Sequence, residues 1–267
     1  MAEASRRTDY VSAAADLLWD HWQRGTRIVA LPEALRPVTR AEGFAIQSQL
    51  ESRTHGDIYG WKIAATSVAG QAHIGVDGPL AGRILRETVL EAGGVCPLTN
   101  CLMRVAEAEF AFRMRSTLQP RDEPFSIEEV TDAVGSLHPA IEIPDTRYTD
   151  FVKVGAAQLI ADNACAHRFV LGAAAAESWR KIDLAQHSVT ASGRGIVETT
   201  GRGANVLGNP LIGLTWLANE LRAFGVALGE GQVVTTGTCI IPVAIAPGAA
   251  VTMDFGSLGT VSLSFTD

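Results

Sequence analysis

Hydrophobic and polar positions divide the chain into a helical start and a strand-rich remainder. Residues 10–24 are rich in Ala, Leu and Trp, and Gly25 then provides a helix stop. Thr39 and Glu42 form the capping-box pattern, in which each residue's side chain satisfies a backbone donor of the other. The pattern therefore predicts two helices, joined by a proline-containing connector at residues 31–37.

From residue 58 the pattern changes to short runs rich in Val, Ile and Thr, which are separated by Gly and Pro. Such runs are typical of β-strands. Their spacing suits a β-sandwich or a rolled sheet rather than a regular alternation of strands and helices. The predicted strands are residues 59–66, 107–114, 140–143, 232–245, 250–255 and 259–265.

Two further helices are predicted to interrupt these strands. Ser126 and Glu129 repeat the capping-box pattern. The apolar residues that follow at three- and four-residue spacing are Ile127, Val130, Val134 and Leu137. Asn209 and Pro210 open the second helix, which Gly225 ends. The fold class is therefore α+β, with a helical N-terminal region at residues 1–57 and a β-rich body at residues 58–267.

Composition supports a folded, soluble protein. Of 267 residues, 47% are hydrophobic and 19% are charged, so the chain can build a large core, and disorder is excluded. The 22 basic and 29 acidic side chains give a net charge of −7, and no basic run occurs that would favour nucleic-acid binding. No apolar run approaches the roughly 18 residues of a membrane helix.

The four cysteines show neither zinc-site spacing nor a dense disulfide framework. Cys96 and Cys101 are close in sequence, but we expect buried free thiols there. Together with the absence of a secretory segment, this favours a cytoplasmic protein. No serine-hydrolase elbow, P-loop or metalloprotease motif occurs, and the six histidines are scattered.

The acidic residues carry more information. Glu107 and Glu109 lie two residues apart in an apolar strand-like run, so both carboxylates are expected on one face of the strand. Two carboxylates about 5 Å apart repel by roughly 3 kcal/mol at an effective dielectric of 20. A third acid, Glu142, is also flanked by apolar residues. Three such ligands suit Mg²⁺ or Mn²⁺, although a polar, solvated sheet face would give the same pattern.

Lys62 lies in a similar apolar run. A lysine in such a strand can extend its ammonium to solvent. It can instead present a positive charge to negative charge that develops during a reaction. The pattern alone leaves both interpretations open.

Several short motifs, in the same order along the chain, resemble the 2-keto-4-pentenoate hydratase group of the fumarylacetoacetate hydrolase superfamily. They span roughly residues 58 to 240. The motifs are GWKIAATS at 60–67, GVDGP at 75–79, AEAEFAF at 106–112, PAIEI at 139–143, ADNA at 161–164, VLGNP at 206–210, WLAN at 216–219 and TTGT at 235–238.

The resemblance implies a mixed β-sandwich roll whose body binds a metal and carries out catalysis. Matched by position, Glu107, Glu109 and Glu142 are the ligands of a divalent metal, Mg²⁺ or Mn²⁺. Lys62 matches an active-site lysine, and Asp77 matches an acidic residue near the substrate.

The substrate implied is a small 2-oxo or 2-hydroxydienoic acid. The activity implied is hydration of a 2-hydroxy-2,4-dienoate to a 4-hydroxy-2-oxo acid in the degradation of aromatic compounds. Thr238 falls in the loop that helps to hold the substrate carboxylate. The resemblance also favours a homo-oligomer, which could associate with a related pathway enzyme.

Three alternatives remain open at this point. A 4-oxalocrotonate-type decarboxylase would need to hold a second carboxylate, for which Arg104, Arg147 and His138 are candidates. Hydrolysis of an acylpyruvate and a catalytically silent partner subunit are the other two. The chain also departs from the group's pattern at Cys165, where relatives often carry Ser, and the pattern assigns no role to His138 or His167.

Overall fold

The helical N-terminal part agrees with the sequence pattern. The computed structural model describes residues 2–54 and 58–267, with side chains from residue 10 onward in the first helix. Helix α1 spans Ala2–Arg24 and α2 spans Arg40–Ser48. Thr39 caps α2 in the predicted capping box with Glu42. The predicted boundary after residue 57 falls on segment 55–57, which lies outside the described residues.

The larger of two sheets holds the first predicted strands. Its strand order is β2-β1-β10-β5-β6-β7-β3, and β11 pairs with β5. The strands are β1 Ile58–Ala64, β2 Leu80–Leu85, β3 Val89–Leu90, β5 Val105–Met114, β6 Val134–Ile143, β7 Arg168–Leu171, β10 Val233–Thr238 and β11 Val243–Ala244. Strands β2 and β3 stand at opposite ends of this order, yet only Arg86–Thr88 separates them in sequence. The sheet therefore curls until its two edges approach each other.

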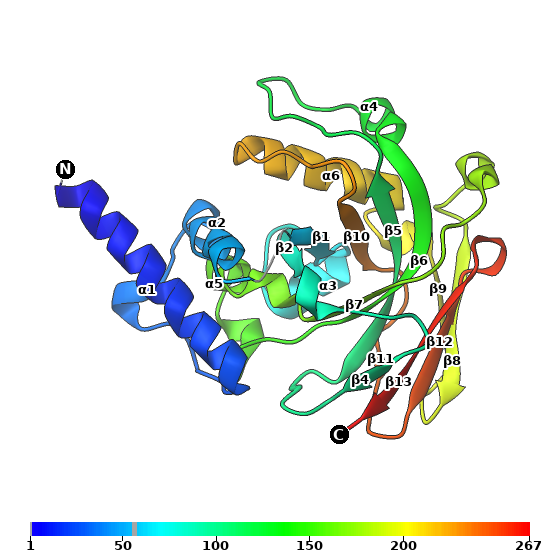
Figure 1. The fold of residues 1–267 in the computed structure, drawn as a ribbon, viewed down its shortest axis with the longest axis horizontal. Coiled ribbons are helices and arrows are strands. Elements are labelled where there is room, and N and C mark those ends of the chain that lie inside the picture. The colour runs from blue at the N-terminus through cyan, green and yellow to red at the C-terminus, as the bar shows by residue number, and fades with distance from the viewer. Residues whose placement is uncertain (1, 55–57) are drawn as a thin grey trace.

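A second sheet packs beside the first, at the end of the molecule opposite α1 (Figure 1). Its strand order is β4-β13-β12-β8-β9. The strands are β4 Val95–Pro97, β8 Ser188–Arg194, β9 Thr199–Arg202, β12 Ala250–Asp254 and β13 Thr260–Thr266. The predicted fold class, an α+β protein with a mixed β-sandwich roll, is confirmed.

Four further α-helices in the described residues connect or cover the sheets: α3 Val68–Ile74, α4 Ile127–Asp132, α5 Ala156–Ala161 and α6 Pro210–Ala223. Helix α6 begins as predicted, with Asn209 as N-cap and Pro210 in the first turn. Among residues 2–54 and 58–267, no helix is both long and apolar enough to cross a membrane.

One predicted element is wrong in its extent. Helix α4 starts at the predicted capping box but ends at Asp132, and residues 134–143 form strand β6. In β6, Val134 pairs with Met114 and Leu137 pairs with Phe112. Their helix-like spacing therefore reflects packing of a strand on the main core and not the continuation of a helix.

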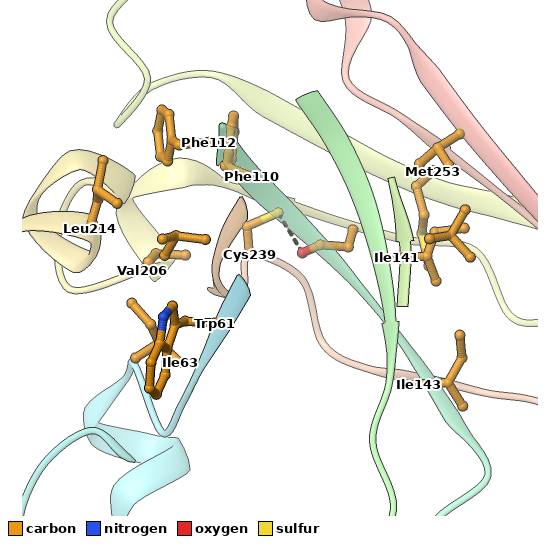
Figure 2. Packing of buried hydrophobic residues seen from close by; sticks show 14 of the residues in the cluster. Trp61, Ile63, Phe110, Phe112, Ile141, Ile143, Val206, Leu214, Cys239 and Met253 are labelled. Carbon is orange, nitrogen blue, oxygen red and sulfur yellow. Dashed lines mark hydrogen bonds between the residues drawn. The ribbon is translucent and has the colours of Figure 1, made fainter. Parts of the chain in front are cut away.

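The main core lies between the two sheets and α6. Figure 2 shows part of it, where Phe112, Val206 and Leu214 come from three separate segments. The thiol of Cys239 lies here and donates to the backbone oxygen of Ala108 at 3.1 Å. All four cysteines are buried and free, as expected for Cys96 and Cys101.

Candidate metal centre and active site

Glu107, Glu109 and Glu142 form a cluster on the curled sheet. Strand alternation places Glu107 and Glu109 on one face of β5, while Ala108 and Phe110 pack into the main core on the other. The antiparallel register then sets Glu142 of β6 directly opposite Glu107. One carboxylate oxygen from each glutamate lies within 4.8 Å of the other two. The sequence prediction that these three acids share one place is confirmed.

Strand β10 orients one of these carboxylates. Oε2 of Glu109 accepts a hydrogen bond from the Thr235 hydroxyl at 2.5 Å and another from the backbone NH of Gly237 at 2.8 Å. The opposite oxygen, Oε1, is buried and has no hydrogen-bond partner among the described residues, and the same holds for Oε2 of Glu142. Buried polar atoms are nearly always paired. Two unpaired carboxylate oxygens within one cluster of three glutamates therefore fit a cation as their partner.

The electrostatics of the cluster favour the same conclusion. Burial, followed by the charge of Glu142, raises the pKa of Glu107 to about 7. Burial and then Glu107 raise the pKa of Glu109 to about 7. The pKa of Glu142 rises to about 8, mainly because of burial. These carboxylates resist ionisation when no metal is present, and a divalent cation would remove that cost.

Lys62 of β1 joins the cluster from the far side of β10, the strand that lies between β1 and β5. Its side chain is buried, with Nζ 3.1 Å from Oε1 of Glu142 and 3.0 Å from the backbone oxygen of Ala164, to which it donates. Burial alone would lower the pKa of Lys62, but Glu142 and then the other two glutamates outweigh burial and raise it. The ammonium therefore stays charged inside the protein and does not extend to solvent.

A small pocket opens beside Lys62 and Glu142. Its other lining residues are Ile84, Thr88, Ala166, His167, Arg168, Phe169 and Thr235. The lining combines apolar side chains with the charged groups of Lys62, Glu142 and Arg168.

Thr238 lies next to the cluster at the end of β10, where it pairs with Glu109 of β5. Its hydroxyl donates to the backbone oxygen of Ile240 at 2.9 Å. The register is irregular between Thr235 and Thr238, which gives this end of β10 its bend. The substrate-binding role of Thr238 stays a prediction.

Asp77 lies apart from the buried cluster. It follows α3 in a surface loop, its side chain is 88% exposed, and its Oδ1 lies 3.6 Å from the guanidinium of Arg40. Helix α3 itself buries none of its residues. The structure does not bring Asp77 into the group formed by Lys62 and the three glutamates, so its catalytic role stays a prediction.

Arg147 is engaged elsewhere. Its Nε donates to Asp162 at 2.7 Å and its NH2 group donates to the backbone oxygen of Asp145 at 2.9 Å. Its guanidinium carbon lies 3.9 Å from the centre of the Trp22 ring. These contacts join the first helix to the body of the protein. The substrate-binding role predicted for Arg147 is not tested by them.

Two groups in the site were not predicted from the sequence. Thr235 belongs to the quoted TTGT motif and lies in a predicted strand. Its hydrogen bond to Glu109 becomes evident only when β10 is paired with β5. Ala164 contributes a backbone oxygen, which no residue pattern marks.

Comparisons with known proteins identify relatives along most of the chain. No model of a known protein family matches the chain. The chain is 32% identical to a 4-oxalocrotonate decarboxylase from Pseudomonas putida over 231 residues, which cover 85% of this chain and 86% of the relative. It is 31% identical to a 2-keto-4-pentenoate hydratase from Paraburkholderia xenovorans over 255 residues, or 94% and 93% of the two chains.

Solved structures extend the likeness to the fold. A 4-oxalocrotonate decarboxylase from Pseudomonas putida G7, complexed with magnesium and adipate, is 28% identical, with a TM-score of 0.88 over 97% of this chain and 98% of the other. A structure from Burkholderia cenocepacia, at 15% identity and a TM-score of 0.56 over 77% of this chain and 87% of the other, shares the fold alone. The chain therefore belongs to the family of 2-keto-4-pentenoate hydratases and 4-oxalocrotonate decarboxylases, within the fumarylacetoacetate hydrolase superfamily.

Proposed function

We propose that this protein is a divalent-metal-dependent hydratase that adds water to a 2-hydroxy-2,4-dienoate and gives a 4-hydroxy-2-oxo acid. The observation that carries the proposal is the buried ammonium of Lys62, 3.1 Å from Glu142, beside three carboxylates with two unpaired oxygens. This arrangement provides a fixed positive charge next to a place that suits a cation. The fixed ammonium and a bound cation would each stabilise the negative charge that develops on the C2 oxygen of a 2-oxo acid.

The residues that would hold the metal are Glu107, Glu109 and Glu142. Mg²⁺ and Mn²⁺ both prefer such hard oxygen ligands. When bound, the ion supplies Lewis acidity toward the C1 carboxylate and the C2 oxygen of the substrate.

Lys62 would stabilise negative charge on the C2 oxygen. Because the neighbouring glutamates raise its pKa, the side chain is cationic at neutral pH and serves as an electrostatic and hydrogen-bonding group, not as a base. In the proposed sequence, the 2-hydroxyl group of the dienoate loses its proton as C5 gains one. Water then adds across C3 and C4, with its hydroxyl at C4 and its proton at C3. Asp77 is the proposed group for moving these protons, and Thr238 is proposed to contact the substrate carboxylate.

An ultraviolet assay tests the proposal. Purified protein with Mg²⁺ is mixed with 2-hydroxypenta-2,4-dienoate, and the loss of dienol absorbance and the release of CO₂ are followed together. Loss of absorbance without CO₂, abolished by a chelator, supports the hydratase. If dienol absorbance does not fall with Mg²⁺ or with Mn²⁺, the hydratase proposal is refuted.

A 4-oxalocrotonate-type decarboxylase is the second candidate. The similarity to two proteins of that name, one of them solved with a dicarboxylate, favours it. It shares the metal and the Lys62 charge but requires a substrate with a second carboxylate. The same assay with 4-oxalocrotonate separates the two, because only decarboxylation releases CO₂ as the absorbance falls.

A homo-oligomer and an association with a related pathway enzyme are part of the proposal, and so is a cytoplasmic location. They rest on the resemblance to the family. Size-exclusion chromatography with light scattering measures the first of these directly.

A further inference from the structure

The segment that contacts Lys62 has an unusual backbone. Asn163, Ala164 and Cys165 are consecutive non-glycine residues with φ angles of 57°, 50° and 61°. Residues with a side chain seldom adopt this left-handed region, and three in a row are rarer still. Such a conformation persists only where surrounding contacts enforce it, and it is often found at active sites.

The side chain of Asn163 enforces it. Oδ1 of Asn163 accepts a hydrogen bond from the backbone NH of Arg83 at 2.6 Å, and Nδ2 donates to the backbone oxygen of Arg83 at 2.8 Å. Asn163 thus pairs with strand β2 as another strand would. Both residues are buried, so no water competes for these bonds.

The turn is also packed tightly against Lys62. A Cβ atom on Gly82 would lie 2.3 Å from the backbone oxygen of Asn163 and 3.1 Å from Cγ and Cδ of Lys62. Only glycine fits at this position. The turn, β2 and the Lys62 side chain are therefore one close-packed unit, in which a shift of the turn displaces the lysine.

Arg83 is itself held in place. Its Nε donates to Glu51 at 2.9 Å, and its guanidinium also bonds to Gln47. The guanidinium carbon lies 4.8 Å from the ring of Phe44 and 4.7 Å from the ring of Trp61. The N-terminal helical region therefore fixes β2, and β2 fixes Asn163.

We propose that Asn163 is a positioning residue, which holds the Ala164 carbonyl where it orients the Lys62 ammonium toward Glu142 and the substrate. The proposal rests on the proposed function, since Lys62 is assigned its part there. Asn163 does not touch the substrate. It acts through the turn, and its loss leaves Lys62 present but misdirected.

The chain offers a matched control. Asn219 of α6 clamps the backbone of Phe125 in the same way, with Oδ1 accepting at 2.8 Å and Nδ2 donating at 3.0 Å. Asn219→Ala removes the same two kinds of hydrogen bond at a place outside the glutamate cluster. Asn163→Ala and Asn163→Gly remove the clamp at the site, and the glycine variant does so without strain from a left-handed φ.

The test compares kcat, KM and Tm for the three variants with Mg²⁺ and 2-hydroxypenta-2,4-dienoate, together with crystal structures of Asn163→Gly and Asn219→Ala. We expect kcat to fall by roughly tenfold to hundredfold in both Asn163 variants, because a displacement near 1 Å costs about that much. KM should change less than kcat. Asn219→Ala should lower Tm and keep kcat.

Two kinetic results would overturn the proposal: native kcat in folded Asn163→Gly, or an equal loss of kcat in Asn219→Ala. The crystal structures give a readout that does not depend on turnover. Lys62 should leave the Ala164 oxygen in Asn163→Gly and stay in Asn219→Ala. If the native protein lacks turnover but the lysine moves in this way, the proposed function fails and the positioning role stands. If the lysine does not move, the positioning role fails.

Discussion

Nζ of Lys62 and Oε1 of Glu142 lie 3.1 Å apart, and both side chains are almost fully buried. A buried ion pair is costly to desolvate, and its removal on one side leaves an uncompensated charge. Here one ammonium faces three carboxylates. The cluster is therefore short of positive charge, and this shortage underlies the predictions that follow.

Replacing Lys62 with Met keeps the volume of the side chain but removes its charge. We expect kcat to fall by about 10²–10³, the loss typical of a preorganised electrostatic group. Lys62 lowers the pKa of all three glutamates, so these pKa values should rise in the variant. Mg²⁺ should therefore still bind, but only at a higher pH, where the glutamates are ionised. Steady-state kinetics and calorimetric Mg²⁺ titration measure both effects. The exposed Lys153 provides the control Lys153→Met, and a Lys62→Met variant with native kcat would remove the lysine from the mechanism.

Thr235 holds Glu109, so Thr235→Val should weaken the metal site. We expect Mg²⁺ affinity to fall by about 10–100-fold, as is common when a group that orients a metal ligand is lost. Thr236 is an adjacent control, because it is also buried but donates to the backbone oxygen of Phe110. Isothermal titration calorimetry with Mg²⁺ measures the metal affinity of both variants. Equal affinities in Thr235→Val and Thr236→Val would show that the Thr235 bond does not orient the ligand.

Asp77 is exposed, so its replacement tests chemistry without disturbing the fold. If it moves protons, Asp77→Asn should lower kcat by about 10²–10⁴ while Tm stays unchanged. The exposed Asp122 gives a matched control, Asp122→Asn. Turnover and thermal unfolding are measured on the same samples. A kcat within twofold of the native value for Asp77→Asn would exclude Asp77 as the proton-transfer group.

The glutamate cluster predicts how stability depends on pH. In metal-free protein the pKa values of Glu107, Glu109 and Glu142 are about 7, 7 and 8, above the ordinary 4.5. The folded state then binds more protons than the unfolded state between about pH 4.5 and 8. By linkage, the free energy of unfolding falls as pH rises through this range.

Calorimetry of chelator-treated protein at pH 5.5, 7 and 8.5 checks this slope. Glu142→Gln should show a shallower fall in Tm, since one titrating group is gone. Added Mg²⁺ should raise Tm more at pH 8.5 than at pH 5.5, because the ligands must lose their protons to bind it. The same slope in native protein and Glu142→Gln would contradict the assignment.

Local patterns were enough to predict part of this site. Alternation along one strand places Glu107 and Glu109 on a common face, and this depends on two residues of separation only. Helix starts at Thr39, Ser126 and Asn209 were also predictable, because capping is a local interaction.

Non-local pairing explains what the sequence pattern missed. Residues 134–137 repeat a helical spacing, but pairing with β5 makes them a strand, since tertiary contacts override local propensity. Thr235 reaches Glu109 through an irregular register. The left-handed turn at residues 163–165 depends on a clamp to Arg83, 80 residues away in the chain. None of these has a signature within a short window.

Metal-dependent turnover tests the central claim most directly. Native protein, Glu107→Gln and the exposed control Glu128→Gln are compared with 2-hydroxypenta-2,4-dienoate, with Mg²⁺ and with chelator, while dienol absorbance and CO₂ are recorded. We predict Mg²⁺-dependent loss of absorbance without CO₂ in native protein and in Glu128→Gln. Glu107→Gln should lose both bound metal and activity. Chelator-resistant turnover, or metal binding and activity unchanged in Glu107→Gln, would contradict the account.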